Sequence, residues 1–149
     1  MFLAVKGLTR RLMSLIAILA VCGIAVSSVS LQHHYATSKT AYCDFGETFN
    51  CDIVNRSEYS SIFGIPVALI GMLGYAALAG LATVYRERQE TPTMLFSAAA
   101  AGLAFALYLT YIEGHVLGVW CILCLSSLVL IAATTILAAV IWRKRERIQ

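Results

Sequence analysis

The chain has 149 residues, of which 60% are hydrophobic and 13% are charged, and its formal net charge is +3. Its mean hydropathy of +0.80 lies far outside the range of soluble globular proteins. This composition indicates an integral membrane protein and excludes a sizeable separate soluble domain. Most of the basic residues lie in short clusters that flank apolar segments, as is typical of membrane anchors. Nothing in the sequence predicts binding to nucleic acid.

Four apolar runs have the length of a membrane-spanning helix. They cover about residues 12–31, 62–85, 94–112 and 117–142. About 20 helical residues cross a hydrocarbon core about 30 Å thick, and backbone polar groups in lipid need partners within the protein. The sequence therefore predicts an all-α fold, a four-helix transmembrane bundle that forms a single domain over residues 1–149.

The first apolar run resembles a signal peptide, with a basic start and small residues around 25–30. The residues before Cys22 are similar to a lipoprotein cleavage site, although Val21 stands where a small residue is expected. We expect the run to be retained, because it is nearly as long as a full span and three remaining helices would pack less well. Cys22 is then predicted to be a small packing residue.

Basic residues mark one side of the predicted membrane. They precede the first run, separate the second from the third and follow the fourth, whereas the other side has only Lys39 and Arg56. The positive-inside rule then places both termini in the cytoplasm. We expect a multi-pass protein of the cell inner membrane. Residues 32–61 and the short turn 113–118 are expected to face outward. The basic clusters comprise Lys6, Arg10, Arg11, Arg86, Arg88, Arg143, Lys144, Arg145 and Arg147.

Four of the five cysteines fall on the predicted outer side. Cys43 and Cys51 lie in the long outer segment, and Cys121 and Cys124 form a Cys-x-x-Cys pair at the outer end of the last run. Disulfides persist outside the cytosol. Three interpretations stay open: a redox-active set, two structural disulfides, or a zinc site of four thiolates.

The Cys-x-x-Cys spacing favours redox chemistry. A disulfide that closes so short a loop adds little chain-entropy stabilisation, but it exchanges readily. A following helix N-terminus lowers the pKa of the first thiol, here Cys121. Since the pair stands at the membrane boundary, it can meet a lipid-soluble quinone such as menaquinone or ubiquinone. Cys124, one turn deeper than Cys121, is the better placed of the two.

The same motifs carry a family resemblance. Cys43, Cys51-Asp52, Ser57, the stretch Ser61-Ile62-Phe63-Gly64-Ile65-Pro66 and Cys121-Ile122-Leu123-Cys124 occur in this order. The chain thereby resembles the vitamin K epoxide reductase family, in particular its bacterial single-domain members, over about residues 12–142. The unrelated DsbB-type oxidases have the opposite order, with Cys-x-x-Cys first.

The resemblance implies roles for these residues. Cys121 and Cys124 would be the active-site pair, with Cys124 facing a bound quinone. Cys43 would exchange with a secreted dithiol protein of thioredoxin fold, similar to DsbA, and Cys51 would pass electrons on through a disulfide with Cys121. Ser57 would lie near the active site on a short half-helix, and the outer segment between the first two spans would form a cap loop over the bundle.

Two positions depart from the members that reduce vitamin K epoxide. Ser60 stands where those members have Asn, and Leu128 stands where they have Tyr. Both missing side chains donate hydrogen bonds to the quinone in those members. The departures favour plain quinone reduction over epoxide reduction. The predicted quinone contacts are Cys124, Ser60, Phe63, Trp120 and Leu128.

Two further pairs of polar residues have two interpretations each. His33 and His34 are either a metal pair or interfacial residues, and we favour the second because adjacent side chains point to different sides. Glu113, with His115, either takes up protons released by thiol oxidation or lies in a solvated turn, which we favour. No metal site is predicted.

Overall fold

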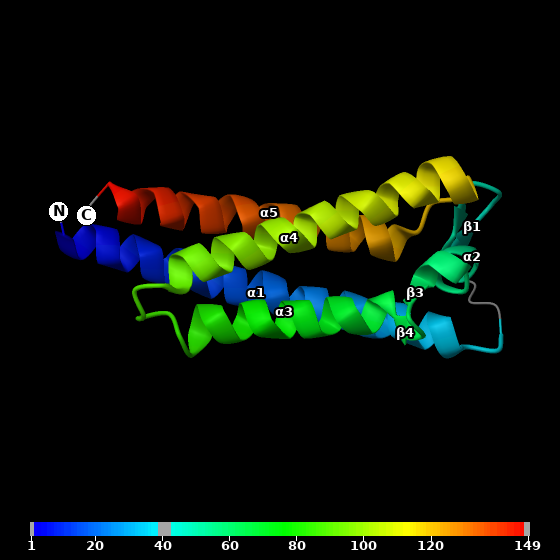
Figure 1. The fold of residues 1–149 in the computed structure, drawn as a ribbon, viewed down its shortest axis with the longest axis horizontal. Helices are drawn as coiled ribbons and strands as arrows, with labels where there is room; N and C mark the ends of the chain where they lie inside the picture. Colours follow the sequence, from blue (N-terminus) through cyan, green and yellow to red (C-terminus); the bar gives the residue numbers. More distant parts are fainter. Residues whose placement is uncertain (1, 39–42, 148–149) are drawn as a thin grey trace.

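The computed structural model describes residues 2–38 and 43–147. Four long helices lie side by side in it (Figure 1): α1 (Phe2–Tyr35), α3 (Val67–Thr83), α4 (Thr91–Ile112) and α5 (Ile122–Glu146). Helix α1 packs against α3 and α5, and α4 packs against α5 and α3. Helix α1 starts and α5 ends at the same end of the bundle, and the short elements between α1 and α3 lie at the opposite end.

The bundle is held together by an apolar core along its axis. The largest buried contributions come from Ile16 of α1, Tyr75 and Leu78 of α3, Leu95 of α4 and Ile131 of α5. Many large apolar side chains instead point outward along the helices, including Ile18, Leu73, Leu107, Val129 and Ile136, each more than half exposed. An apolar exterior of this extent is typical of a surface that faces lipid.

Three helical segments are long and apolar enough to cross a membrane: Lys6–Tyr35, Thr91–Leu117 and Ile122–Glu146. They correspond to the first, third and fourth predicted spans. Helix α3 is apolar but has only 17 residues, which gives it a length of about 26 Å at 1.5 Å per residue. The second span, predicted over residues 62–85, is therefore shorter as a helix than the sequence indicated.

The first residues of the predicted second span form a small hairpin instead of a helix. Strands β3 (Ser61–Ile62) and β4 (Ile65–Pro66) pair antiparallel around Phe63 and Gly64. These two residues have φ angles of 52° and 79°, the positive values that the tight type I′ turn requires. Because Pro66 also restricts Ile65 to extended backbone, the helix cannot begin before Val67.

The start of α5 also differs from the prediction. The fourth run was predicted to be helical from Leu117, but a π-helical turn, η2 (Glu113–Leu117), continues α4, and Gly118 then reverses the chain at a φ of 66°. Cys121 has extended backbone and is the N-cap residue of α5. The Cys-x-x-Cys pair thus begins just before a helix, with Cys124 in its first turn.

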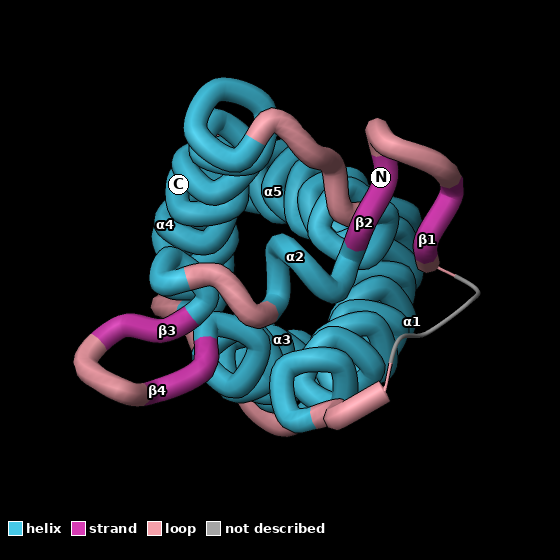
Figure 2. Tube along the Cα trace, turned by 90° about the vertical axis from the view of Figure 1, so that its right-hand side faces the viewer, coloured by secondary structure: helices cyan, strands magenta, loops and turns pink. Residues whose placement is uncertain are grey.

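Residues 43–60, named here the connecting segment, contain two short strands that the all-α prediction lacked. Strands β1 (Asp44–Phe45) and β2 (Phe49–Asn50) form an antiparallel pair, followed by helix α2 (Cys51–Asn55) and a 3₁₀ turn, η1 (Glu58–Ser60). Figure 2 shows α2 at the end of the bundle, among the ends of the long helices. Lys39, one of the two basic residues predicted on this side, lies outside the described residues.

Candidate functional site

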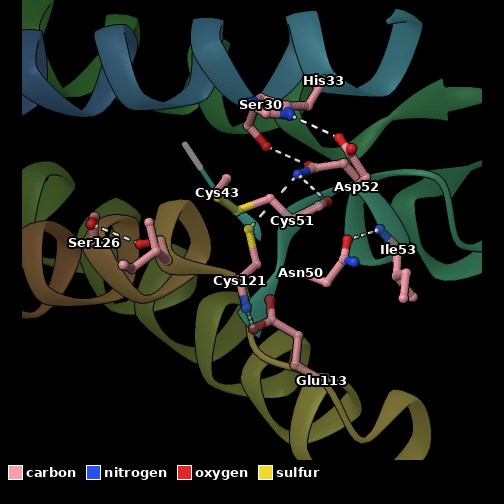
Figure 3. Close-up of a disulfide and its surroundings, with 12 residues drawn as sticks. Ser30, His33, Cys43, Asn50, Cys51, Asp52, Ile53, Glu113, Cys121 and Ser126 are labelled. Atoms are coloured by element: carbon pink, nitrogen blue, oxygen red, sulfur yellow. Dashed lines mark hydrogen bonds and ion pairs between the residues drawn. A yellow bond between two sulfur atoms is a disulfide. The ribbon is translucent and has the colours of Figure 1, made fainter. Parts of the chain in front are cut away.

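Three of the predicted redox cysteines meet in one buried cluster. Cys43 and Cys51 form a disulfide, and Cys121 is a free thiol. All three are at most 2% exposed and pack together with Val54. Figure 3 shows the Cys121 side chain pointing toward the Cys43–Cys51 disulfide. Cys124, also a free thiol, contacts this cluster from the first turn of α5.

Cys22 lies away from this cluster. Its side chain is exposed on α1, so the prediction that Cys22 is a small packing residue is wrong. The buried face of α1 includes Ile16, Ala20 and Gly23, and Cys22 lies outside this face.

Backbone hydrogen bonds join the chain segment before Cys51 to the segment before Cys121. The amide of Asn50 donates to the carbonyl of Trp120 at 3.0 Å, and the amide of Trp120 donates to the carbonyl of Thr48 at 2.9 Å. Phe49 and Trp120 form a parallel bridge. Because Cys51 follows Asn50 and Cys121 follows Trp120, this pairing places the two cysteines next to each other.

Asn55 links helix α2 to both α1 and the thiol cluster. It is 5% exposed, and its Oδ1 accepts a hydrogen bond from the Ser30 hydroxyl at 2.5 Å. Its Nδ2 donates to the carbonyl of Cys51 at 2.9 Å and lies 3.7 Å from Sγ of Cys121. One amide side chain therefore contacts the backbone of one cysteine and the sulfur of the other, a role that the sequence did not indicate.

The two histidines also hold α2 against α1. Nδ1 of His33 lies 3.1 Å from a carboxylate oxygen of Asp52, and Nδ1 of His34 lies 2.6 Å from the carbonyl of Asn55. Within the described part of the chain, no group of three or more His, Cys, Asp or Glu side chains could hold a metal ion. The two rings instead make separate contacts to the connecting segment.

The chemistry of Cys121 is set by its neighbours. The hydrogen bond with the Cys124 thiol lowers the pKa of the Cys121 thiol below its ordinary value, and burial opposes this effect. Its place at the N-terminus of α5 acts in the same direction as the hydrogen bond. The backbone amide of Cys121 donates to Oε2 of Glu113 at 3.1 Å. Cys121 is therefore the better nucleophile of the pair.

An apolar cavity of about 390 Å³ opens inside the bundle beside Cys124. All four long helices and the connecting segment contribute to its wall. Most of the lining is apolar, and the polar side chains are Ser27, Ser30, His34, Asn55, Ser57, Tyr59, Ser60, Tyr75, Glu113 and Ser127. An apolar chamber with a few polar groups is typical of a small-molecule site.

The predicted site residues divide into two groups. Ser57, Ser60 and Cys124 line the cavity. The hydroxyl of Ser57 donates to the carbonyl of Val54 at 2.8 Å, and the hydroxyl of Ser60 donates to the carbonyl of Ser57 at 2.6 Å.

The other three predicted quinone contacts do not line the cavity. Phe63 is fully exposed at the tip of the β3–β4 hairpin. The ring of Trp120 packs over Gly114, where an added Cβ would come within 2.9 Å of it. Leu128 lies just outside the face of α5 that lines the cavity, which comprises Leu123, Cys124, Ser127 and Ile131.

A tyrosine and a serine that the sequence did not single out lie on the cavity wall. The hydroxyl of Tyr75 donates to the carbonyl of Ser127 at 2.8 Å and lies 2.9 Å from the hydroxyl of Ser127. Tyr75 is 5% exposed, and it joins α3 to α5 across the cavity. The spacing of Cys124 and Ser127 by three residues on one helix face was the signal that could have found this serine.

The sequence favoured a solvated turn around Glu113, and this prediction is wrong. Glu113 is 2% exposed, and among the described residues its Oε1 is the one buried side-chain oxygen or nitrogen without a hydrogen bond of ordinary geometry. Its carboxyl group interacts with the Cys124 thiol. His115, two residues on, is exposed and stacks on Tyr111 at 4.5 Å between ring centroids.

Comparison with known protein families gives an independent result. The family described as the vitamin K epoxide reductase family matches residues 14–139. The match contains most of the bundle core, the connecting segment and all four clustered cysteines.

Proposed function

We propose, since the chain belongs to the vitamin K epoxide reductase family, that it is a quinone-dependent thiol–disulfide oxidoreductase. It reoxidises a secreted protein of thioredoxin fold, similar to DsbA, and so supports disulfide formation in exported proteins. Family membership and the three apolar helices support a membrane oxidoreductase of disulfides. The quinone, the partner and the direction of electron flow are the proposal.

The observation that carries the proposal is the packing of Cys121 against the Cys43–Cys51 disulfide. Thiol–disulfide exchange requires a thiolate to approach a disulfide sulfur along the sulfur–sulfur axis. In the relay, a partner dithiol reduces the Cys43–Cys51 disulfide. The freed Cys51 thiolate then attacks a Cys121–Cys124 disulfide at Cys121, and Cys43 resolves the mixed disulfide. Two electrons and two protons then reside on Cys121 and Cys124.

The cavity beside Cys124 supports a quinone as the electron acceptor. A quinone ring needs an apolar slot with few polar contacts, and the cavity lies within the range of about 300–1,000 Å³ of small-molecule sites. Cys124 borders it directly, whereas Cys121 belongs to the buried cluster on the other side. When bound, a quinone accepts two electrons and two protons. Cys121 thus adjoins the Cys43–Cys51 disulfide, and Cys124 adjoins the proposed quinone site. Ser57, Ser60 and His34 contribute polar atoms to the wall of this cavity.

The proposed orientation follows from where the charges and the cysteines lie. Helix α1 starts and α5 ends at one end of the bundle, the end where the α3–α4 connection also lies (Figure 1). Most of the basic residues stand in or beside these three segments. We place this end in the cytoplasm and the connecting segment on the outer face of the cell inner membrane, with α3 and its hairpin completing a fourth span.

The test is quinone-dependent oxidation of a reduced thioredoxin-fold dithiol protein by purified protein in lipid. The wild type oxidises the dithiol and reduces the quinone in equal amounts, while Cys121→Ala and Cys124→Ala do neither. Cys22→Ala, the exposed cysteine, is the matched control and keeps full activity. Persistence of the reaction in the Cys124→Ala variant contradicts the proposal. Reduction of vitamin K epoxide at a rate equal to that of quinone reduction contradicts the assignment of the acceptor.

A further inference from the structure

Glu113 is a buried acid that the relay described above does not use. It stands at the first position of the π-helical turn η2, where α4 ends. Its Oε2 accepts the hydrogen bond from the Cys121 amide at 3.1 Å, and its Oε1 has no hydrogen bond of ordinary geometry among the described residues. A buried carboxyl oxygen without a donor is costly unless a proton or a donor reaches it. The group that meets this carboxyl from the next helix is the Cys124 thiol.

Other titratable side chains on the cavity wall are already engaged or lie at the surface. The hydroxyl of Tyr75 donates to Ser127, and Nδ1 of His34 lies against the carbonyl of Asn55. Tyr59 is 47% exposed. Glu113 therefore combines burial, an open oxygen and a position between the thiol pair and the cavity.

We propose that Glu113 accepts the proton of the Cys124 thiol when the Cys121–Cys124 disulfide forms, and passes this proton to the cavity. This inference rests on the proposed function. Oxidation of the pair removes two electrons and two protons as the sulfur–sulfur bond forms, and a quinone takes up both. Cys121 loses its proton as the thiolate that its surroundings favour, and the proton of Cys124 moves to Oε1 of Glu113. Oε2 meanwhile holds the Cys121 amide, so the same carboxyl group positions one cysteine and deprotonates the other.

The protonation state of the Glu113 carboxyl group can be measured in protein that contains no quinone. In the reduced protein the Cys124 thiol supplies a donor to the carboxylate, whereas a disulfide has none. When no quinone is bound to take the proton onward, Glu113 is therefore expected to be a carboxylate in the reduced protein and a protonated acid in the oxidised protein. Infrared difference spectra between protein reduced with dithiothreitol and protein oxidised with diamide, both stripped of quinone, report this exchange. The oxidised protein gains a carboxylic acid carbonyl band and loses a carboxylate band.

Two variants from the same turn separate a chemical role from a structural one. Glu113→Gln keeps an oxygen that accepts the Cys121 amide, but it cannot take a proton. The two reciprocal bands disappear in it, and single-turnover formation of the Cys121–Cys124 disulfide with a soluble short-chain quinone slows by about 100-fold or more. His115→Gln removes the exposed titratable group two residues away and leaves both readouts unchanged.

The results distinguish this inference from the proposed function. If the wild type shows no reciprocal change, or if Glu113→Gln retains it, the proton transfer is refuted even when quinone reduction is observed. If the wild type shows the change but reduces no quinone, the role of Glu113 beside the thiol pair stands and the assigned acceptor is wrong. If Glu113→Gln oxidises its thiol pair at the wild-type rate, Glu113 is no proton acceptor.

Discussion

Replacement of Asn55 by Ala tests whether this residue holds the connecting segment on the thiol cluster. Asn55 is buried, and its amide makes one hydrogen bond to Ser30 of α1 and another to the carbonyl of Cys51. Alanine removes both bonds without adding bulk. The Ser30 hydroxyl, which is 8% exposed, then loses its acceptor.

The magnitude follows from these two contacts. Each lost hydrogen bond costs about 1 kcal/mol, and a buried polar group left unpaired adds to this, so docking weakens by about 2–3 kcal/mol. Since about 1.4 kcal/mol corresponds to a factor of ten, the population with the connecting segment displaced rises about 30-fold or more. Cys121 is fully buried under the segment, and its alkylation requires this displacement.

The assay is the rate at which a membrane-impermeant maleimide modifies Cys121 while the Cys43–Cys51 disulfide stays intact, read by mass spectrometry of the Cys121 peptide. Asn55→Ala raises the rate about 30-fold. Ile53→Ala is the matched control, because Ile53 lies on the same short helix but is 49% exposed, and it changes the rate less than about twofold. Equal rates in Asn55→Ala and the wild type would refute the reasoning.

Three further predictions concern packing, exchange chemistry and the hairpin. Gly23→Ala lowers the melting temperature, because the new Cβ would lie 2.4 Å from the Tyr75 ring, whereas Gly74→Ala, with nothing within 4 Å, does not lower it. Cys124→Ala removes the hydrogen bond that lowers the pKa of the Cys121 thiol, so the pH midpoint of Cys121 alkylation moves to higher pH; an unchanged midpoint would show that the helix terminus alone sets it. Phe63→Ala leaves the KM for quinone unchanged in steady-state assays, since its side chain is fully exposed away from the cavity; a raised KM would return Phe63 to the quinone site.

The sequence predicted the helices better than their ends. Apolar runs give the position of a buried helix, and three of the four runs became helices long enough to cross a membrane. The ends depend on local backbone geometry that hydropathy does not contain. The positive φ angles at Phe63 and Gly64 and at Gly118 convert apolar residues into turns, so α3 and α5 both begin five residues after the runs that predicted them.

The cysteines of the site were predictable, and their polar neighbours were not. The Cys-x-x-Cys pair and the second cysteine pair can be recognised in the sequence, because thiol–disulfide exchange needs cysteine at these positions. Asn55, Ser30 and Glu113 are ordinary polar residues, and their importance comes from burial and from contacts between helices distant in the sequence. Glu113 in particular was expected in a solvated turn, because no local motif indicates the π-helical turn that buries it.

The burial of the Cys43–Cys51 disulfide imposes two opposite requirements on the proposed relay. A partner dithiol must reach a sulfur along the sulfur–sulfur axis, yet Cys43 and Cys51 are 2% and 1% exposed. Exchange with the partner therefore requires the connecting segment to move out, and transfer from Cys51 to Cys121 requires it to be in place. The Asn55→Ala variant raises the population in which the connecting segment is displaced. It should speed reduction of the Cys43–Cys51 disulfide by an external dithiol and slow the subsequent electron transfer to Cys121, whereas a relay with a fixed segment would show both rates unchanged.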